Sequence, residues 1–138
     1  MKTLVLLEED REAREVFAGV LRRLGYAVIA AGDEAEAHEA IISSKAVHLV
    51  IAGTTDHDRL SFVADVRDSR PHLPVVLMAD YCEPESRLRG FLFGPFAALS
   101  RRNVYINVRP VALYELAELL RSVLVGRRAN RKLRLAAA

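Results

Sequence analysis

The sequence has few of the residues that build covalent cross-links or membrane spans. Its 138 residues include a single cysteine, Cys82, so an internal disulfide is excluded. The acids Asp80, Glu83 and Glu85 surround this cysteine and disfavour a reactive thiolate. No apolar stretch approaches the roughly 18–20 residues of a membrane-spanning helix. These absences argue against a disulfide-stabilised secreted domain and against an integral membrane protein.

The composition is that of one folded domain. Of the residues, 51% are hydrophobic and 28% are charged, a balance typical of globular proteins. The apolar run Leu4–Leu7 resembles the start of a signal peptide, but Glu8, Glu9 and Asp10 interrupt it and no cleavage site follows. We therefore expect a single cytoplasmic domain.

Charge is distributed unevenly along the chain. The net charge is +2, yet the segment 127–138 holds five basic residues and no acid. The rest of the chain then has 15 of the 20 basic residues against all 18 acids, a balance of −3. This pattern predicts a mildly acidic domain over 1–125 and a basic tail or linker over 126–138. The tail has no aromatic residue for base stacking, so nucleic-acid binding through it is only an alternative function.

Short apolar runs alternate with helical patterns. The runs that predict strands are Leu4–Leu7, Ala27–Ala31, His48–Ala52, Val75–Met78 and Val104–Val108. Apolar residues at helical spacing predict five helices, marked by residues 16–24, 37–41, 60–66, 88–92 and 113–124.

The ends of these helices carry sequence signals. Gly25 is expected to end the first helix, and Asp33 with Glu36 resembles a capping box at the start of the second. Pro71 is expected to end the third helix, and Pro84 fits the first turn of the fourth.

Five strands alternating with five helices predict an α/β protein with a parallel sheet. The expected architecture is a flavodoxin-like (βα)5 three-layer sandwich with strand order 2-1-3-4-5. In such a sheet, ligands bind outside the carboxyl ends of the strands. The acids that follow the first strand are therefore expected to lie near the segments 53–58 and 79–81 and near Arg109.

Several motifs occur along the chain in a characteristic order. They are the segment 4–10 ending in Glu-Glu-Asp, Arg14-Glu15 on the following helix, Leu24-Gly25-Tyr26, the run 74–78, and Arg109-Pro110 before the last helix. Over about residues 3–125 the sequence resembles the receiver domains of two-component response regulators. The resemblance implies a role in a signal-transducing phosphorelay, with a protein partner or an output domain.

The resemblance also implies a reaction site, and most of its residues have changed here. In the family, paired acids bind a divalent cation, an aspartate ending the third strand accepts the phosphoryl group, and a hydroxyl and a Lys contact the product. The acid pair falls on Glu8 and Glu9, the acceptor on Gly53, the hydroxyl on Ala79 and the Lys on Arg109. Because glycine has no nucleophile, we expect a pseudo-receiver that is not an enzyme, needs no cofactor, and signals by phosphorylation-independent contact.

Other interpretations of these residues stay open. Glu8 and Glu9 could hold a weakly bound cation, although Mg²⁺ tolerates little change of geometry, or they could form with Asp10 a solvated cluster that caps a helix. Asp56 or Asp58 could replace the missing acceptor, with His57 between them, although they lie three and five residues past the expected strand end.

The segment 84–102 is the expected surface for a protein partner or a second copy of the chain. It and the strand after it contain aromatic and arginine residues, which are enriched at interfaces. The candidates are Phe91, Phe93, Phe96, Arg101, Arg102 and Tyr105. The triplet Gly94-Pro95-Phe96 is a rival match for the basic-Pro motif.

Arg109 is expected to take the place of the metal. A guanidinium holds a carboxylate through two hydrogen bonds and stays charged at every physiological pH. We therefore expect Arg109 to lie beside Glu8 and Glu9 and to neutralise them.

Overall fold

The computed structural model describes residues 1–44, 46–53, 59–80, 104–109 and 113–125; for 60, 79–80, 104–109 and 113–114 it describes the backbone alone. The elements in chain order are β1 (Thr3–Leu7), α1 (Arg11–Arg23), β2 (Ala27–Ala31), α2 (Glu34–Ser43), β3 (Val47–Gly53), α3 (Arg59–Ser69), β4 (Val75–Asp80), β5 (Val104–Arg109) and α6 (Leu113–Leu124). The expected helix beginning near Pro84 lies outside the described residues.

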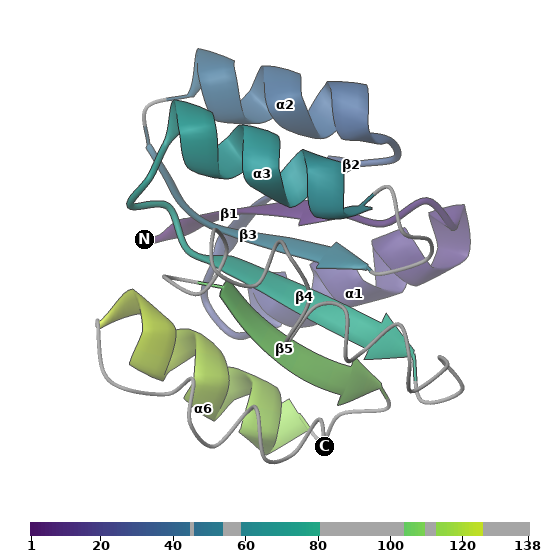
Figure 1. Ribbon diagram of the computed structural model, residues 1–138. Coiled ribbons are helices and arrows are strands. Elements are labelled where there is room, and N and C mark those ends of the chain that lie inside the picture. Colours follow the sequence, from purple (N-terminus) through teal and green to yellow (C-terminus); the bar gives the residue numbers. More distant parts are fainter. Residues whose placement is uncertain (45, 54–58, 81–103, 110–112, 126–138) are drawn as a thin grey trace.

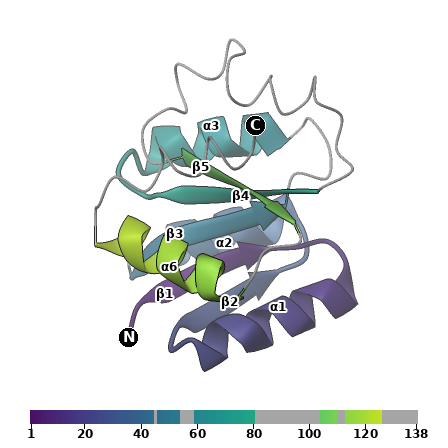
Figure 2. The ribbon, with the colours of Figure 1, turned by 90° about the horizontal axis from the view of Figure 1, so that it is seen from below.

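The five strands form one parallel sheet with the order β2-β1-β3-β4-β5, which confirms the predicted topology. Helices α2 and α3 cover one face of the sheet, and α1 and α6 cover the other (Figures 1 and 2). This is the three-layer sandwich that the alternation of strands and helices predicts.

Each face of the sheet has its own hydrophobic core. In β1, Val5 and Leu7 pack under α2 and α3, whereas Leu4 and Leu6 pack under α1 and α6. All four side chains are almost completely buried. Because successive residues of a strand point to opposite faces, a strand covered on both sides must be apolar throughout. This explains the continuous apolar runs of the central strands.

The ends of the first two helices follow their sequence signals. Gly25 has a φ of 100° just after α1, a conformation that favours glycine. Asp33 caps α2 by accepting a hydrogen bond from the Glu36 amide at 2.8 Å. The Glu36 side chain accepts from the amide of Gly32 and not from that of Asp33, so the capping box is shifted by one residue.

One residue of the predicted first helix does not face the core. Val16, one of the apolar residues that marked the helix, is 69% exposed, whereas Ala18 and Leu21 are buried. Successive helical residues are about 100° apart, so Val16 lies about 200° from Ala18 around the helix axis. Its side chain therefore points outward and forms part of the exposed surface of α1.

The register brings the carboxyl ends of the central strands to one edge of the sheet. Leu7 of β1 pairs with Ala52 of β3, and Gly53 pairs with Met78 of β4. Immediately after Leu7, the Glu8 amide donates to the carbonyl of Ala31 at the end of β2. The turn after β1 therefore lies beside the end of β3, where the sequence predicts the functional crevice.

Candidate functional site

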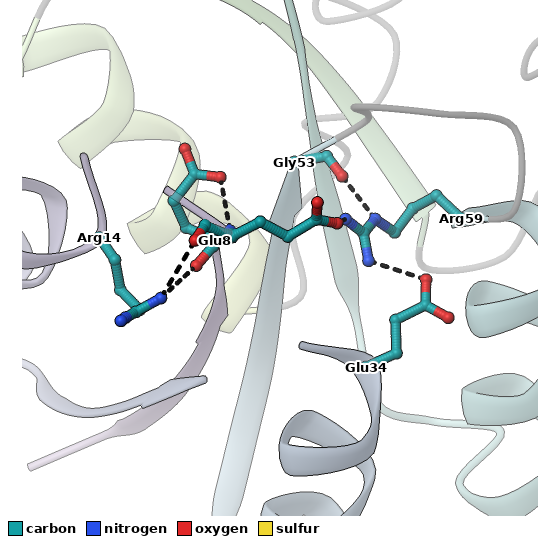
Figure 3. Close-up of polar contacts among 6 residues, drawn as sticks. Glu8, Arg14, Glu34, Gly53 and Arg59 are labelled. Atoms are coloured by element: carbon teal, nitrogen blue, oxygen red, sulfur yellow. Dashed lines mark hydrogen bonds and ion pairs between the residues drawn. The ribbon is translucent and has the colours of Figure 1, made fainter. Parts of the chain in front are cut away.

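The turn after β1 is fixed by its own hydrogen bonds and by one arginine. The Glu8 side chain is buried, and its carboxylate accepts from the Glu9 amide at 3.1 Å. Arg14, on the first turns of α1, donates to the carbonyls of Glu8 at 2.9 Å and Glu9 at 3.4 Å (Figure 3). These contacts hold the backbone of the acid pair in one conformation.

The three consecutive acids have three different partners. Glu8 binds the backbone of the turn, and Asp10 is the N-cap of α1, accepting from the Ala13 amide at 2.9 Å. Glu9 instead contacts an arginine side chain. The helix-capping interpretation is therefore confirmed for Asp10. Within the described ranges, no group of three or more His, Cys, Asp or Glu side chains is arranged to hold a metal ion.

The centre of the site is the guanidinium of Arg59. Its Nη2 donates to Glu9 Oε1 at 2.8 Å and its Nη1 to Glu34 Oε2 at 2.8 Å. Its Nε donates to the carbonyl oxygen of Gly53 at 2.6 Å. Figure 3 shows the guanidinium between the end of β3 and the start of α2. We call Arg59, Glu9, Glu34 and the Gly53 carbonyl the Arg59 cluster.

Burial makes the Arg59 cluster energetically significant. The Arg59 side chain is 2% exposed, whereas those of Glu9 and Glu34 are 52% and 37% exposed. A buried cation is strongly unfavourable unless it is paired and hydrogen-bonded, and Arg59 has both kinds of compensation. Charge-assisted bonds of this kind are stronger than neutral ones. The carboxylates of Glu9 and Glu34 remain partly exposed to water, and solvent screening weakens their ion pairs with Arg59.

The elements that position the cluster meet only because of the fold. Glu34 and Arg59 are the first residues of α2 and α3, Gly53 is the last residue of β3, and Glu9 follows β1. The N-terminus of a helix repels a cation and attracts a carboxylate. The helix dipole therefore stabilises Glu34 at the start of α2. The dipole of α3 destabilises Arg59, and the ion pairs with Glu9 and Glu34 must offset this unfavourable energy.

Gly53 provides a backbone group and no side chain. It is buried, and it ends β3 opposite Met78 in the register with β4. Its carbonyl oxygen is an acceptor for Arg59. At the position where the receiver resemblance places the phosphoacceptor, the chain thus presents a carbonyl to a cation and no carboxylate to a phosphoryl group.

The other two positions implied by the resemblance are described only as backbone. Ala79 pairs with Val108, and Arg109 ends β5 opposite Asp80. The Arg109 side chain lies outside the described residues, so its pairing with Glu8 and Glu9 stays a prediction. Among the described residues, Arg59 lies beside Glu9 and forms an ion pair with it.

The side chains of several further candidates also lie outside what the structure describes. Tyr105 is placed as backbone in β5, opposite Val76. The other residues in this group are Asp56, His57, Asp58, Cys82, Phe91, Phe93, Phe96, Arg101 and Arg102.

Arg59 and Glu34 were not predicted as site residues from the sequence, and Arg14 was predicted only as a motif residue on the helix that follows the acids. The sequence did carry one signal for Arg59. An arginine at the start of a helix interacts unfavourably with the helix dipole, so its presence there indicates a stabilising partner elsewhere in the structure. Glu34 could be interpreted equally well as a favourable first-turn acid. Nothing in a single sequence indicates that residues 9, 34 and 59 converge.

The sequence matches no family profile and no curated protein. Solved structures do match. A response regulator receiver domain protein of Clostridium thermocellum has a TM-score of 0.74 at 14% identity, over 96% of this chain and 97% of that one. The chemotaxis protein CheY4 of Vibrio cholerae has a TM-score of 0.71 at 19% identity, over 89% and 98%. The chain therefore has the fold of these proteins.

A third match is to a much longer protein. NtrX of Brucella abortus, in complex with ADP, has a TM-score of 0.73 at 22% identity. The match covers 96% of this chain and only 28% of NtrX. The match thus spans nearly the whole of the first two solved chains and about a quarter of the NtrX chain. No helix among the described residues is long and apolar enough to cross a membrane.

Proposed function

We propose that this chain is a receiver-type signalling module that acts through protein contacts and does not accept a phosphoryl group. The observation that carries the proposal is the contact between Gly53 and Arg59. The end of β3 offers a backbone carbonyl, and a buried guanidinium already occupies the space beside it. The receiver fold of the structural neighbours supports the signalling role.

The chemistry of phosphoryl transfer explains why this contact matters. An acceptor carboxylate attacks the phosphoryl group, and a cation neutralises the phosphoryl oxygens. One structural neighbour, TrrA of Thermotoga maritima, is known in complex with Mg²⁺ and BeF. Here Gly53 provides no nucleophile, and Glu9 is paired with an internal cation. Neither requirement of the reaction is met by these residues.

Arg59 supports a signalling module with a constant structure at this edge of the sheet. A phosphorylated site changes its charge when the group is added and removed. A guanidinium keeps its charge at every physiological pH, and Arg59 joins β3, the turn after β1 and α2 through three hydrogen bonds. We infer that the signal depends on which partner is bound and not on a covalent modification.

The proposed partner is a protein or an output domain, and the proposed location is the cytoplasm. The match to part of NtrX is consistent with a module that serves a larger assembly. The segment 84–102, with Phe93 and Phe96, stays the predicted partner surface. We propose no catalytic residue, no cofactor and no nucleic-acid role.

The test is incubation of the intact protein with a small phosphodonor and Mg²⁺, followed by intact-mass measurement. A conventional receiver domain, treated in parallel, serves as the positive control. We expect no adduct of about 80 Da, the mass of one phosphoryl group. A stable adduct mapped to Asp56 would overturn the proposal and favour a displaced acceptor. The variant Asp56→Asn would distinguish that adduct from modification elsewhere.

A further inference from the structure

The outward face of α1 carries four residues at the spacing of a helix-pairing seam. Glu12, Val16, Gly19 and Arg23 follow one another at intervals of 4, 3 and 4 residues. At about 100° per residue, all four lie opposite the buried face that contains Ala18 and Leu21. Intervals of three and four residues align side chains along one helix face, as in antiparallel helix pairs. We call these four residues the α1 seam.

The packing of the described residues does not explain two members of the α1 seam. Val16 is a β-branched hydrophobic residue with 69% of its surface exposed. Gly19 lies in the middle of α1, where glycine disfavours the helix. A Cβ atom at Gly19 would meet no atom of the described residues within 4 Å, so their packing does not require a glycine there. A glycine beside an exposed valine instead leaves room for a second helix to approach.

We propose that the α1 seam binds the α1 seam of a second copy of this chain, with the two helices antiparallel about a twofold axis. A twofold axis between residues 17 and 18 places Val16 against Gly19 of the other copy. It also places Glu12 against Arg23 of the other copy. A twofold interface repeats each contact, so one surface provides two valine–glycine contacts and two ion pairs.

The order of the charges along α1 favours an antiparallel orientation and a second copy of the chain as the partner. The α1 seam is acidic at its start and basic at its end, so an antiparallel copy brings opposite charges together. A parallel copy would place Glu12 against Glu12 and Arg23 against Arg23. The helix dipoles also favour the antiparallel arrangement. A surface whose charges complement their own reversed copy fits a second copy of the same chain.

The size of the surface predicts a weak association. Two single helices cover less than the roughly 1,000 Å² expected of a stable specific interface. We therefore expect a reversible dimer that forms at high protein concentration or when a partner brings two copies together. The inference does not depend on the absence of phosphoryl transfer, because α1 makes its proposed contacts on the side away from the sheet.

The decisive experiment measures the mass of the full chain by sedimentation over a wide concentration range. We expect a monomer–dimer equilibrium. Glu12→Arg and Arg23→Glu should each raise the dissociation constant at least about tenfold, since each converts two attractive pairs into repulsive ones. The double variant Glu12→Arg/Arg23→Glu should dimerise like the wild type. An equimolar mixture of the two single variants should also recover association, because opposite charges meet again.

Gly19→Gln separates loss of the interface from loss of folding. Glutamine is a better helix former than glycine, so we expect a higher melting temperature together with at least about tenfold weaker association. Val16→Gln should weaken association similarly, whereas Ile42→Gln, at a 74% exposed position on α2, should not. A protein that stays monomeric throughout would overturn the inference. So would a dimer that survives all the α1 variants and is lost in Phe93→Glu.

Discussion

Arg59 and Glu9 are separated by 50 residues in the sequence, yet their side chains form an ion pair of 2.8 Å. The pair joins the start of α3 to the turn after β1, and a second bond from the same guanidinium reaches Glu34 at the start of α2. The buried guanidinium of Arg59 thus connects the start of α3 to the turn after β1 and to the start of α2 by side-chain contacts. These contacts add to the hydrogen bonds between the strands of the sheet. Replacement of Arg59 is therefore the most direct test of how this edge of the sheet is stabilised.

We expect Arg59→Gln to lower the free energy of unfolding by about 2–3 kcal/mol, because removing one member of a buried charge cluster leaves polar partners unsatisfied. The value lies below that of a fully buried pair, since Glu9 and Glu34 can be rehydrated. Urea denaturation provides the measurement. The matched control is Arg11→Gln, whose exposed pair with Glu15 should contribute less than about 0.5 kcal/mol. Equal effects of the two variants would contradict a special role for Arg59.

Divalent cations should distinguish wild type from Arg59→Gln. In the wild type, the guanidinium occupies the space between Glu9, Glu34 and the Gly53 carbonyl. Without it, three oxygen-bearing groups of the type that Mg²⁺ and Ca²⁺ bind would face one another. We expect millimolar Mg²⁺ or Ca²⁺ to raise the melting temperature of Arg59→Gln but not that of the wild type. The control Arg59→Gln/Glu34→Gln should lose the response, and a response of the wild type would contradict the prediction.

Restoring the acceptor should not restore the reaction. An aspartate introduced by Gly53→Asp would stand next to the Arg59 guanidinium, which contacts the carbonyl of the same residue. We expect the new carboxylate to be held as an ion pair instead of acting as a nucleophile with a bound Mg²⁺. Ala79 also lacks the hydroxyl that would contact the product. Intact-mass measurement after treatment with a phosphodonor should show little or no adduct, and efficient labelling would show that Arg59 does not block the site.

The sequence predicts the fold of this protein better than its site. The two-sided burial of β1, β3 and β4 follows from their continuous apolar runs, because a parallel strand covered on both faces must be apolar throughout. The strand order follows from the preference for right-handed crossovers in a flavodoxin-like sheet. The positions of the acid turn after β1 and of Gly53 at the end of β3 also follow from the sequence. Arg59 was missed because its role depends on Glu9 and Glu34, which approach it only through the tertiary structure. The outward orientation of Val16 was not predicted, because helical spacing alone does not distinguish a buried helix face from a seam on the opposite side.

Tyr26 provides a pH-dependent test of the second core. It follows α1 and packs, half-buried, against the cluster under α1 and α6. Burial raises the pKa of Tyr26 above its ordinary value of 10.0, and the positive charge of Arg121 on α6 lowers it in part. A raised pKa means that the folded state binds the phenolic proton more tightly than the unfolded state does. The stabilising contribution is therefore fully present below a pH of about 10 and is lost as the pH rises through the folded-state pKa.

We expect the wild type to lose stability relative to Tyr26→Phe above a pH of about 10, while the difference between the two stays constant below it. Comparing two chains that differ only at position 26 removes the contribution of the other three tyrosines. Arg121→Gln should make the loss larger, because the charge that opposes the effect of burial is gone. The measurement is urea denaturation across the alkaline range, with ionisation of Tyr26 followed by ultraviolet difference absorbance. A constant stability difference between wild type and Tyr26→Phe at every pH would show that Tyr26 ionises equally in the folded and unfolded states.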